Sequence, residues 1–266
     1  MDPGFYNMDC LDGMREMDDE SIDLTVTSPP YDNLRDYHGY MFDYKATLEQ
    51  LFRVTKIGGV VVWIVNDQTV NGSETGTSFR QALYAMECGF NLHDTMIWHK
   101  SGFGFPDSNR YYPIFEYMFV FSKGIPATAN LIADRRNIHG NTKIHGTSRQ
   151  PDGSLKRSNG DKKRDIPAYG RRFNVWQINE EKANRTGHPA VFPVRLAIDH
   201  ILSWSNECDL VLDPFTGSGT TGIAAHRTNR RFMGFEIDPV YYKAAKERLD
   251  RETAQVNITE LLGGRT

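Results

Sequence analysis

The chain has 266 residues, of which 39% are hydrophobic and 12% aromatic, a composition that excludes a disordered chain and suits one large domain with an inserted lobe. The net charge of −3 does not by itself indicate a nucleic-acid partner. Cys10, Cys88 and Cys208 lie far apart, which argues against a disulfide framework and a zinc site, so we expect no metal.

The hydropathy pattern argues against insertion in a membrane. The densest apolar run, residues 60–65, has the length of a strand, whereas a membrane-spanning helix needs about 20 apolar residues. The first residues lack the basic start and apolar core of a signal peptide. We therefore expect a cytoplasmic protein without membrane contact.

The first half of the chain alternates between strand and helix patterns. Strands are predicted at residues 5–7, 22–27, 60–65, 94–99 and 115–121, and helices at 47–57 and 78–88. The first helix is predicted to end at Gly58-Gly59 and the second at Gly89, because glycine commonly follows a helix. This alternation predicts an α/β fold with a mostly parallel sheet.

The periodicity disappears between Lys123 and Arg172. Residues 122–172 hold twelve Lys or Arg and four acids, which gives +8 and leaves nineteen basic and thirty acidic residues, or −11, for the remainder. A basic region on an acidic body is typical of a protein that binds a polyanion at one place. A solvated, partly disordered insertion is the alternative. We divide the chain into residues 1–123, an insertion at 124–172, and residues 173–266.

Regular patterns return in the last third of the chain. Strands are predicted at residues 174–178, 210–213 and 232–237, and helices at 193–204, from the turn after residue 213 to 228, and from 239 to 249. Asp238 and Pro239 are good residues for the cap and first position of the last helix.

A glycine-rich turn, Asp213-Pro214-Phe215-Thr216-Gly217-Ser218-Gly219-Thr220-Thr221, connects a predicted strand to a predicted helix. Glycines let the backbone approach a ligand closely, and Glu236, after the next strand, can accept both hydroxyls of a ribose. Gly217, Gly219 and Gly222 also satisfy the pattern of dinucleotide-binding proteins, so NAD is an alternative ligand. The negative charge of Asp213 favours a ligand with an amino group or a sulfonium, which indicates S-adenosylmethionine.

A second motif, Ser28-Pro29-Pro30-Tyr31, follows a predicted buried strand. The Ser28 hydroxyl and the Pro29 carbonyl can accept the two N–H bonds of an exocyclic base amine, and proline rigidity holds these acceptors in place. Tyr31 offers a flat surface for a base that has been flipped out of the DNA double helix. An ordinary loop between a strand and a helix is the alternative.

Together, Thr27-Ser28-Pro29-Pro30-Tyr31 and the glycine-rich turn resemble the two main motifs of the amino-methylating DNA methyltransferases, in the order of that family's β group. The resemblance covers most of the chain. His188-Pro189-Ala190-Val191-Phe192-Pro193 and Asn7-Met8-Asp9-Cys10-Leu11 resemble further cofactor segments of the family. Residues 97–100 and 115–123 resemble the strand pair before its target-recognition segment, which falls on residues 124–172.

The resemblance implies a Rossmann-like, doubly wound mixed sheet of the S-adenosylmethionine-dependent methyltransferase type, with an inserted target-recognition segment. It implies direct methyl transfer from S-adenosylmethionine to the amine of a flipped base in double-stranded DNA. Serine at position 28 favours the cytosine 4-amine, and the adenine 6-amine is the alternative. A non-catalytic DNA-binding module, and methylation of RNA or of a protein glutamine, are competing hypotheses. A homodimer and a cognate restriction endonuclease are further partners that the resemblance suggests.

Three sets of site residues are predicted. The catalytic set is Ser28, Pro29, Pro30 and Tyr31. The cofactor-binding set is Asp9, Cys10, His188, Phe192, Asp213, Pro214, Phe215, Gly217, Ser218, Gly219, Thr220 and Glu236. The DNA-binding set is Arg135, Arg136, Lys143, Lys156, Arg157, Lys162, Lys163, Arg164, Arg171 and Arg172, and some of its arginines are expected to read guanine.

Overall fold

The computed structural model describes residues 1–30, 42–102, 108–142, 147–157, 165–179 and 192–263, and in the last helix it describes side chains up to residue 254. The chain forms two compact units. Unit 1 comprises Met1–Asn130 and Asn174–Thr266, and unit 2 comprises Leu131–Phe173. None of the described helices is long and apolar enough to cross a bilayer.

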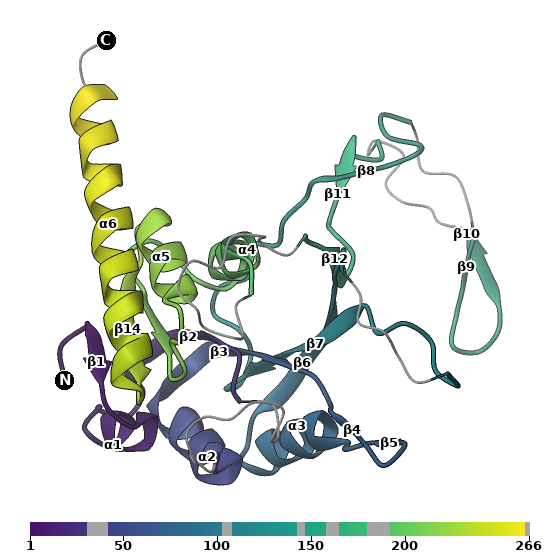
Figure 1. Cartoon of the computed structure of the whole chain (residues 1–266). Helices are drawn as coiled ribbons and strands as arrows, with labels where there is room; N and C mark the ends of the chain where they lie inside the picture. The colour runs from purple at the N-terminus through teal and green to yellow at the C-terminus, as the bar shows by residue number, and fades with distance from the viewer. Residues whose placement is uncertain (31–41, 103–107, 143–146, 158–164, 180–191, 264–266) are drawn as a thin grey trace. The chain divides into compact units, whose positions relative to one another are not determined.

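Unit 1 is built on an eight-stranded sheet in the order β1-β14-β13-β2-β3-β7-β6-β12 (Figure 1). The strands are β1 (Phe5–Asn7), β2 (Ile22–Thr27), β3 (Thr55–Val65), β6 (Asn91–His99), β7 (Phe115–Ser122), β12 (Val175–Gln177), β13 (Leu210–Asp213) and β14 (Arg231–Glu236). Neighbouring strands are parallel except at β7, which is antiparallel to both β3 and β6. The predicted mixed α/β fold is confirmed.

Helices cover both faces of this sheet (Figure 1). One face carries α1 (Cys10–Arg15), α2 (Tyr44–Val54) and α3 (Thr77–Glu87), and the other carries α4 (Val194–Trp204), α5 (Thr220–Arg227) and α6 (Pro239–Gly263). Along β3, Trp63 packs into the first of two hydrophobic cores, while Val62 and Ile64 pack into the second. Because successive side chains of a strand point to opposite faces, a continuous apolar run is needed where both faces are covered. A short hairpin, β4 (Thr69–Val70) and β5 (Ser73–Glu74), precedes α3.

The predicted end of the first long helix at Gly58-Gly59 is wrong. Helix α2 ends at Val54, and β3 already begins at Thr55. Gly58 adopts a φ of 83°, its N–H donates to the Lys123 carbonyl at 2.6 Å, and the β2–β3 register shifts beside it. Gly58 therefore lies at an irregularity within a strand, where its positive φ is needed as much as after a helix.

Two other helices differ from prediction. Helix α1 was not predicted, because six residues are too few to show a helical period; the Asp9 carboxylate caps it by accepting from the Leu11 N–H at 2.7 Å. Helix α6 continues beyond Leu249 to Gly263.

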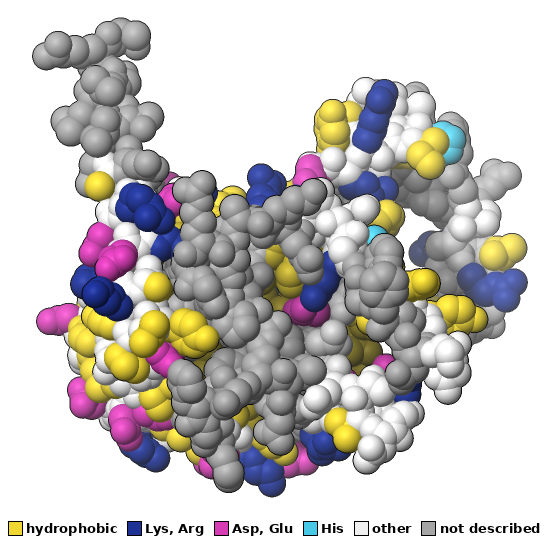
Figure 2. Space-filling view, in the orientation of Figure 1, with side chains coloured by type: hydrophobic (Ala, Val, Ile, Leu, Met, Phe, Trp, Pro, Cys, Tyr) yellow, Lys and Arg dark blue, Asp and Glu magenta, His cyan; other side chains and the backbone are white. Residues whose placement is uncertain are grey.

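Unit 2 is held by two short strand pairs. Strand β8 (Arg135–Arg136) pairs with β11 (Tyr169–Gly170), and β9 (Thr147–Arg149) pairs with β10 (Leu155–Arg157), both antiparallel. Figure 2 shows Lys and Arg side chains at the surface where Figure 1 draws these strands. The predicted insertion at 124–172 overlaps unit 2, and its role in reading DNA stays a prediction.

Candidate functional site

The two motifs leave the sheet at the same edge. Strand β2 ends at Thr27 and β13 ends at Asp213, and these parallel strands are direct neighbours, with Leu212 opposite Thr25. The Thr27 hydroxyl donates to Asp213 Oδ1 at 2.6 Å, and the Thr221 hydroxyl donates to the Val26 carbonyl at 3.1 Å. Loops almost two hundred positions apart in the sequence are thus joined directly at the carboxyl edge, where open α/β sheets bind ligands.

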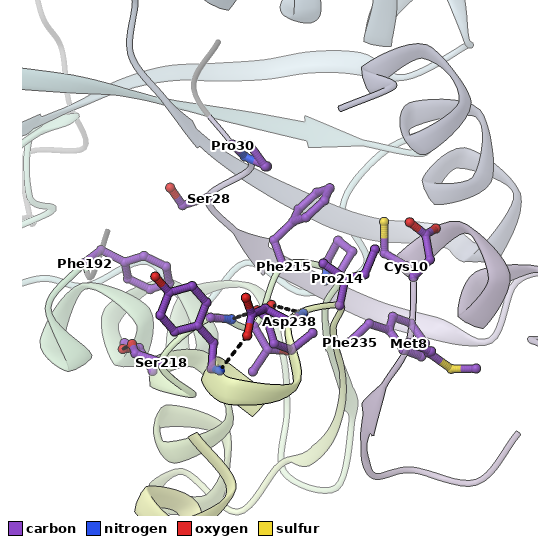
Figure 3. A pocket seen from close by; sticks show the side chains of 17 residues that line it. Met8, Cys10, Ser28, Pro30, Phe192, Pro214, Phe215, Ser218, Phe235 and Asp238 are labelled. Atoms are coloured by element: carbon purple, nitrogen blue, oxygen red, sulfur yellow. Dashed lines mark hydrogen bonds between the residues drawn. The ribbon is translucent and has the colours of Figure 1, made fainter. Parts of the chain in front are cut away.

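Both loops line one pocket of about 800 Å³, a volume that includes space open to solvent. Figure 3 shows Ser28 and Pro30 from the first loop, with Pro214, Phe215 and Ser218 from the second, around this space. The lining residues are Met8, Asp9, Cys10, Ser28, Pro30, Phe192, Pro214, Phe215, Thr216, Gly217, Ser218, Thr220, Phe235, Glu236, Ile237, Asp238 and Tyr241. None of these described residues is Lys or Arg. The pocket therefore offers carboxylates and aromatic rings to a ligand.

The turn after β13 depends on two glycines with positive φ. Gly217 has φ 51° and Gly219 has φ 83°, a region that other residues adopt only with strain. This backbone brings Gly217 and Ser218 into the pocket wall before α5 begins at Thr220. The Phe215 ring contacts the Phe42 ring edge-on at 5.1 Å, which holds it in a fixed orientation at the pocket.

Gly234 in β14 makes room for the same turn. A Cβ atom at Gly234 would lie 2.4 Å from both Thr216 Oγ1 and the Phe232 ring, and the Thr216 hydroxyl is already bonded to the Asp213 carbonyl at 3.0 Å. We expect Gly234→Ala to lower the free energy of unfolding by about 1–3 kcal/mol, because Thr216 and Phe232 must both move. Urea denaturation measures this change. Gly4→Ala is the control, since the atoms nearest to its Cβ would be those of the Tyr6 side chain at 3.2 Å. An equal loss in both variants would contradict the explanation.

Glu236 stands at the end of β14 with its carboxylate in the pocket wall. Its Oε2 accepts from the Gly217 N–H and its Oε1 from the Asp238 N–H, each at 2.9 Å. Burial raises the pKa of this carboxyl, and the two backbone hydrogen bonds oppose that rise. Each carboxylate oxygen has two acceptor positions, so one on each remains for hydroxyl groups of a ligand.

Asp213 lies behind the pocket wall and not on its surface, with 1% of its area exposed. It accepts from the Thr27 hydroxyl and, at 3.1 Å, from the Phe215 N–H. Burial raises its pKa to about 6, against hydrogen bonds from Thr27 and the Phe215 N–H that lower it. Through these hydrogen bonds Asp213 joins the two loops, and its predicted contact with a cofactor stays a prediction.

Helix α6 and its predicted cap, Asp238, contribute pocket residues that the sequence analysis did not assign to the site. Asp238 caps it by accepting from the Val240 N–H at 2.7 Å, and Asp238 and Tyr241 both line the pocket. Arg248, two turns further along, donates from Nη1 to the Ser218 carbonyl at 3.0 Å and to the Thr220 hydroxyl at 3.3 Å. The strong helix start at Asp238-Pro239, directly after Glu236, was the available signal for this end of the pocket.

The pocket contains most, but not all, of the predicted catalytic and cofactor-binding residues. Those of the predicted sets that line it are Asp9, Cys10, Ser28, Pro30, Phe192, Pro214, Phe215, Gly217, Ser218, Thr220 and Glu236. Pro29, Asp213 and Gly219 lie next to lining residues without lining it themselves. Tyr31 and His188 lie outside the described residues. The lining residues missed by sequence reasoning are Met8, Thr216, Phe235, Ile237, Asp238 and Tyr241.

The predicted DNA-binding residues belong to unit 2. Of these, Arg135, Arg136, Lys156, Arg171 and Arg172 are described with their side chains. For Arg157 the structure describes the backbone alone, and Lys143, Lys162, Lys163 and Arg164 lie outside the described residues.

Comparison with known proteins gives consistent similarities. A family model described as DNA methylase matches residues 22–247. M.BamHII, an orphan methyltransferase of Bacillus amyloliquefaciens, is 56% identical over an alignment of 239 residues that covers 87% of this chain and 89% of that protein. A putative DNA modification methylase from Thermus thermophilus, solved with S-adenosyl-L-methionine, is 26% identical, with a TM-score of 0.62 over 94% of this chain and 95% of its own. PvuII DNA methyltransferase, described as cytosine-N4-specific, shares the fold, with a TM-score of 0.67 over 95% of this chain and 92% of its own at 20% identity.

Proposed function

Because this chain belongs to the DNA methylase family, we propose that it transfers a methyl group from S-adenosylmethionine to the 4-amino group of a cytosine in duplex DNA. The observation that carries the proposal is the joint pocket. Ser28 and Pro30, from the motif suited to an amine, line the same space as the glycine-rich turn suited to a cofactor. A methyl donor and an acceptor amine held by these loops would face each other with no large movement of the sheet.

The pocket residues fit S-adenosylmethionine better than a dinucleotide. Asp9, Glu236 and Asp238 place three carboxylates around the space, while no Lys or Arg is found among its described lining residues. Carboxylates repel a pyrophosphate and attract an ammonium or sulfonium group. The acceptor positions left on Glu236 suit the two hydroxyls of a ribose, and Phe192, Phe215 and Phe235 offer apolar surface for an adenine. When bound, S-adenosylmethionine supplies a methyl group on a positively charged sulfur.

The protein's own contribution to the reaction is to position and activate the amine. The lone pair of an exocyclic amine is delocalised into the ring, so the amine is a weak nucleophile. The Ser28 hydroxyl and the Pro29 carbonyl are the acceptors proposed for its two N–H groups, which favours a localised lone pair directed at the methyl group. A flipped target base is part of this proposal, since a paired amine is out of reach inside the duplex.

The choice of cytosine rests on residue 28. A neutral serine, in place of an aspartate, resembles the cytosine 4-amine enzymes, and the adenine 6-amine is the second candidate. The full chain, incubated with duplex DNA and labelled S-adenosylmethionine and followed by mass spectrometry of the nucleosides, separates the two. We expect N4-methylcytosine among the nucleosides. Detection of N6-methyladenine instead would show that adenine, and not cytosine, is the target base. Transfer to RNA or protein in preference to DNA, or no transfer at all, would contradict the proposal.

Arg248 is expected to support cofactor binding from behind the glycine-rich turn. Its bonds to the Ser218 carbonyl and the Thr220 hydroxyl hold the start of α5 against α6. We expect Arg248→Ala to weaken S-adenosylmethionine binding about tenfold, since a hydrogen bond from a charged group contributes roughly 1.5–3 kcal/mol. Calorimetry measures the affinity. Lys246→Ala, which removes an exposed ion pair with Asp250 on the same helix, is the control; a similar loss there would contradict the role of Arg248.

Unit 2 is proposed to hold the DNA, on the strength of its charge. A homodimer and a cognate restriction endonuclease stay predictions from the family resemblance. Size-exclusion chromatography with light scattering tests the first, and a search for a linked endonuclease gene tests the second.

A further inference from the structure

The arginine side chains of unit 2 have different environments, although the sequence alone does not distinguish them. Arg172 forms a two-point ion pair with Asp134, in which Nε donates to Oδ1 at 3.1 Å and Nη2 donates to Oδ2. Such a pair uses the fork of donors that would otherwise bind a guanine or a phosphate. Arg172 therefore braces the unit.

Arg135 is also engaged within unit 2. Its Nε donates to the Arg171 carbonyl at 3.0 Å, and its guanidinium lies 4.4 Å from the centre of the Phe173 ring. Stacking on an aromatic ring together with a backbone hydrogen bond fixes this side chain on the framework. Arg135 and Arg172 thus connect the two ends of unit 2. The neighbouring residue of β8, Arg136, is exposed instead.

Arg136 lies at an open hollow in unit 2, which is lined by Arg136, Asn137, Ile138, Gly140, Asn141, Ala168 and Tyr169. In the β8–β11 pair, Arg136 stands directly opposite Tyr169, so their side chains leave on the same face. Arg136 is exposed, and Tyr169 has 57% of its area exposed. An arginine and an aromatic ring therefore share one accessible surface.

The wall of this hollow is fixed by backbone bonds. The Asn137 N–H donates to the Ala168 carbonyl at 2.9 Å, and the Asn141 N–H donates to the Ile166 carbonyl at 2.7 Å. The Asn137 side chain donates to the Pro167 carbonyl at 2.8 Å, so its amide is committed to the wall. Asn137 is thus held against the wall by its amide, whereas Arg136 is exposed and carries the fork of donors suited to read a base edge.

We infer that Arg136 reads a guanine in the major groove of the target DNA through two parallel hydrogen bonds to O6 and N7. This rests on the proposed function, because it assumes that duplex DNA is the substrate. Arg135 and Arg172 are positioning residues that hold β8 in place, and Tyr169 supplies a flat contact beside the guanidinium. Among the base contacts that an arginine makes, the two-point bond to guanine is the commonest specific one.

Arg136→Lys tests this inference, since lysine keeps the charge and lacks the fork. The full chain, as wild type and variant, selects bound duplexes from a library of random sequences at one fixed salt concentration. We expect the wild type to prefer guanine at one position by about ten- to a hundredfold, and Arg136→Lys to reduce that preference severalfold or more while the other positions keep theirs. Lys156→Ala is the control: it removes an exposed charge of the β9–β10 hairpin and is expected to weaken binding evenly across sequences.

The outcomes separate this inference from the proposed function. An unchanged motif with Arg136→Lys, an even loss across all sequences, or a wild type without any preference would overturn the reading of guanine by Arg136. A wild type that selects a motif but transfers no methyl group would overturn the transferase and leave Arg136 as a reader. Thermal unfolding of Arg136→Lys, expected to match the wild type because the side chain is exposed, excludes a folding defect as the cause.

Discussion

Ser28→Ala is expected to lower the rate of methyl transfer by about a hundredfold or more, while the affinity for S-adenosylmethionine changes little. Removing one preorganised hydrogen-bonding group from a reaction centre has effects of about 10²–10³ on the rate. The Ser28 side chain lines the pocket from the β2 loop, whereas the carboxylates and glycines suited to the cofactor come from other loops. Single-turnover rates, measured beside calorimetry with the cofactor alone, separate the two effects.

Ser28→Thr is the matched control, because threonine keeps the hydroxyl. It is expected to recover most of the rate that Ser28→Ala loses. Equal losses of rate and cofactor affinity in Ser28→Ala would mean that Ser28 acts on the cofactor, and the division of tasks between the two loops would have to be abandoned.

The strand–turn–helix segment around Asp213 could be predicted closely from the sequence. Predicted strand 210–213 coincides with β13, and predicted strand 232–237 differs from β14 by one residue at each end. Both strands are short apolar runs bounded by strong turn residues, so local chemistry specifies them. That the β2 loop meets the same edge followed from the rule that parallel strands end together.

Other features depend on contacts between distant residues and were out of reach. Gly58-Gly59 looked like a helix end because a glycine after a helix and a glycine at a strand irregularity, here Gly58, both adopt a positive φ. Only the pairing of β3 distinguishes the two cases. Arg248 reaches Ser218 across thirty positions, so no local pattern indicates it. In unit 2 the charge was evident, but the partners that engage Arg135 and Arg172 were not.

The burial of Asp213 behind the pocket wall leads to a pH-dependent prediction. Burial raises the pKa of Asp213 to about 6, from 3.8. Between about pH 4 and pH 6, the folded protein therefore holds a proton on Asp213 that the unfolded chain has already released. The contribution of Asp213 to stability falls as the pH rises from about 4 to beyond 6. A rise of this size corresponds to roughly 3 kcal/mol.

Asp213→Asn should remove this dependence, because asparagine carries no charge to bury and keeps an acceptor for Thr27 and the Phe215 N–H. We expect the free energy of unfolding of Asp213→Asn, minus that of the wild type, to rise by about 3 kcal/mol between pH 4 and pH 8. Urea denaturation at a series of pH values measures it, with Asp12→Asn as the control for removing an exposed carboxylate. If the difference in the free energy of unfolding did not change with pH, ionisation of the buried Asp213 would not destabilise the folded protein, and the explanation would be wrong.

Asp213→Ala separates the charge from the hydrogen bonds. It leaves the Thr27 hydroxyl and the Phe215 N–H without their acceptor, and each unpaired buried group costs about 1–3 kcal/mol. We expect Asp213→Ala to be less stable than Asp213→Asn at every pH and to bind S-adenosylmethionine at least about tenfold more weakly, since the two loops lose their connection. If instead Asp213→Ala kept both its stability and its cofactor affinity, the joint pocket would not need this carboxylate, and the geometry would have to be held by Thr221 and the backbone alone.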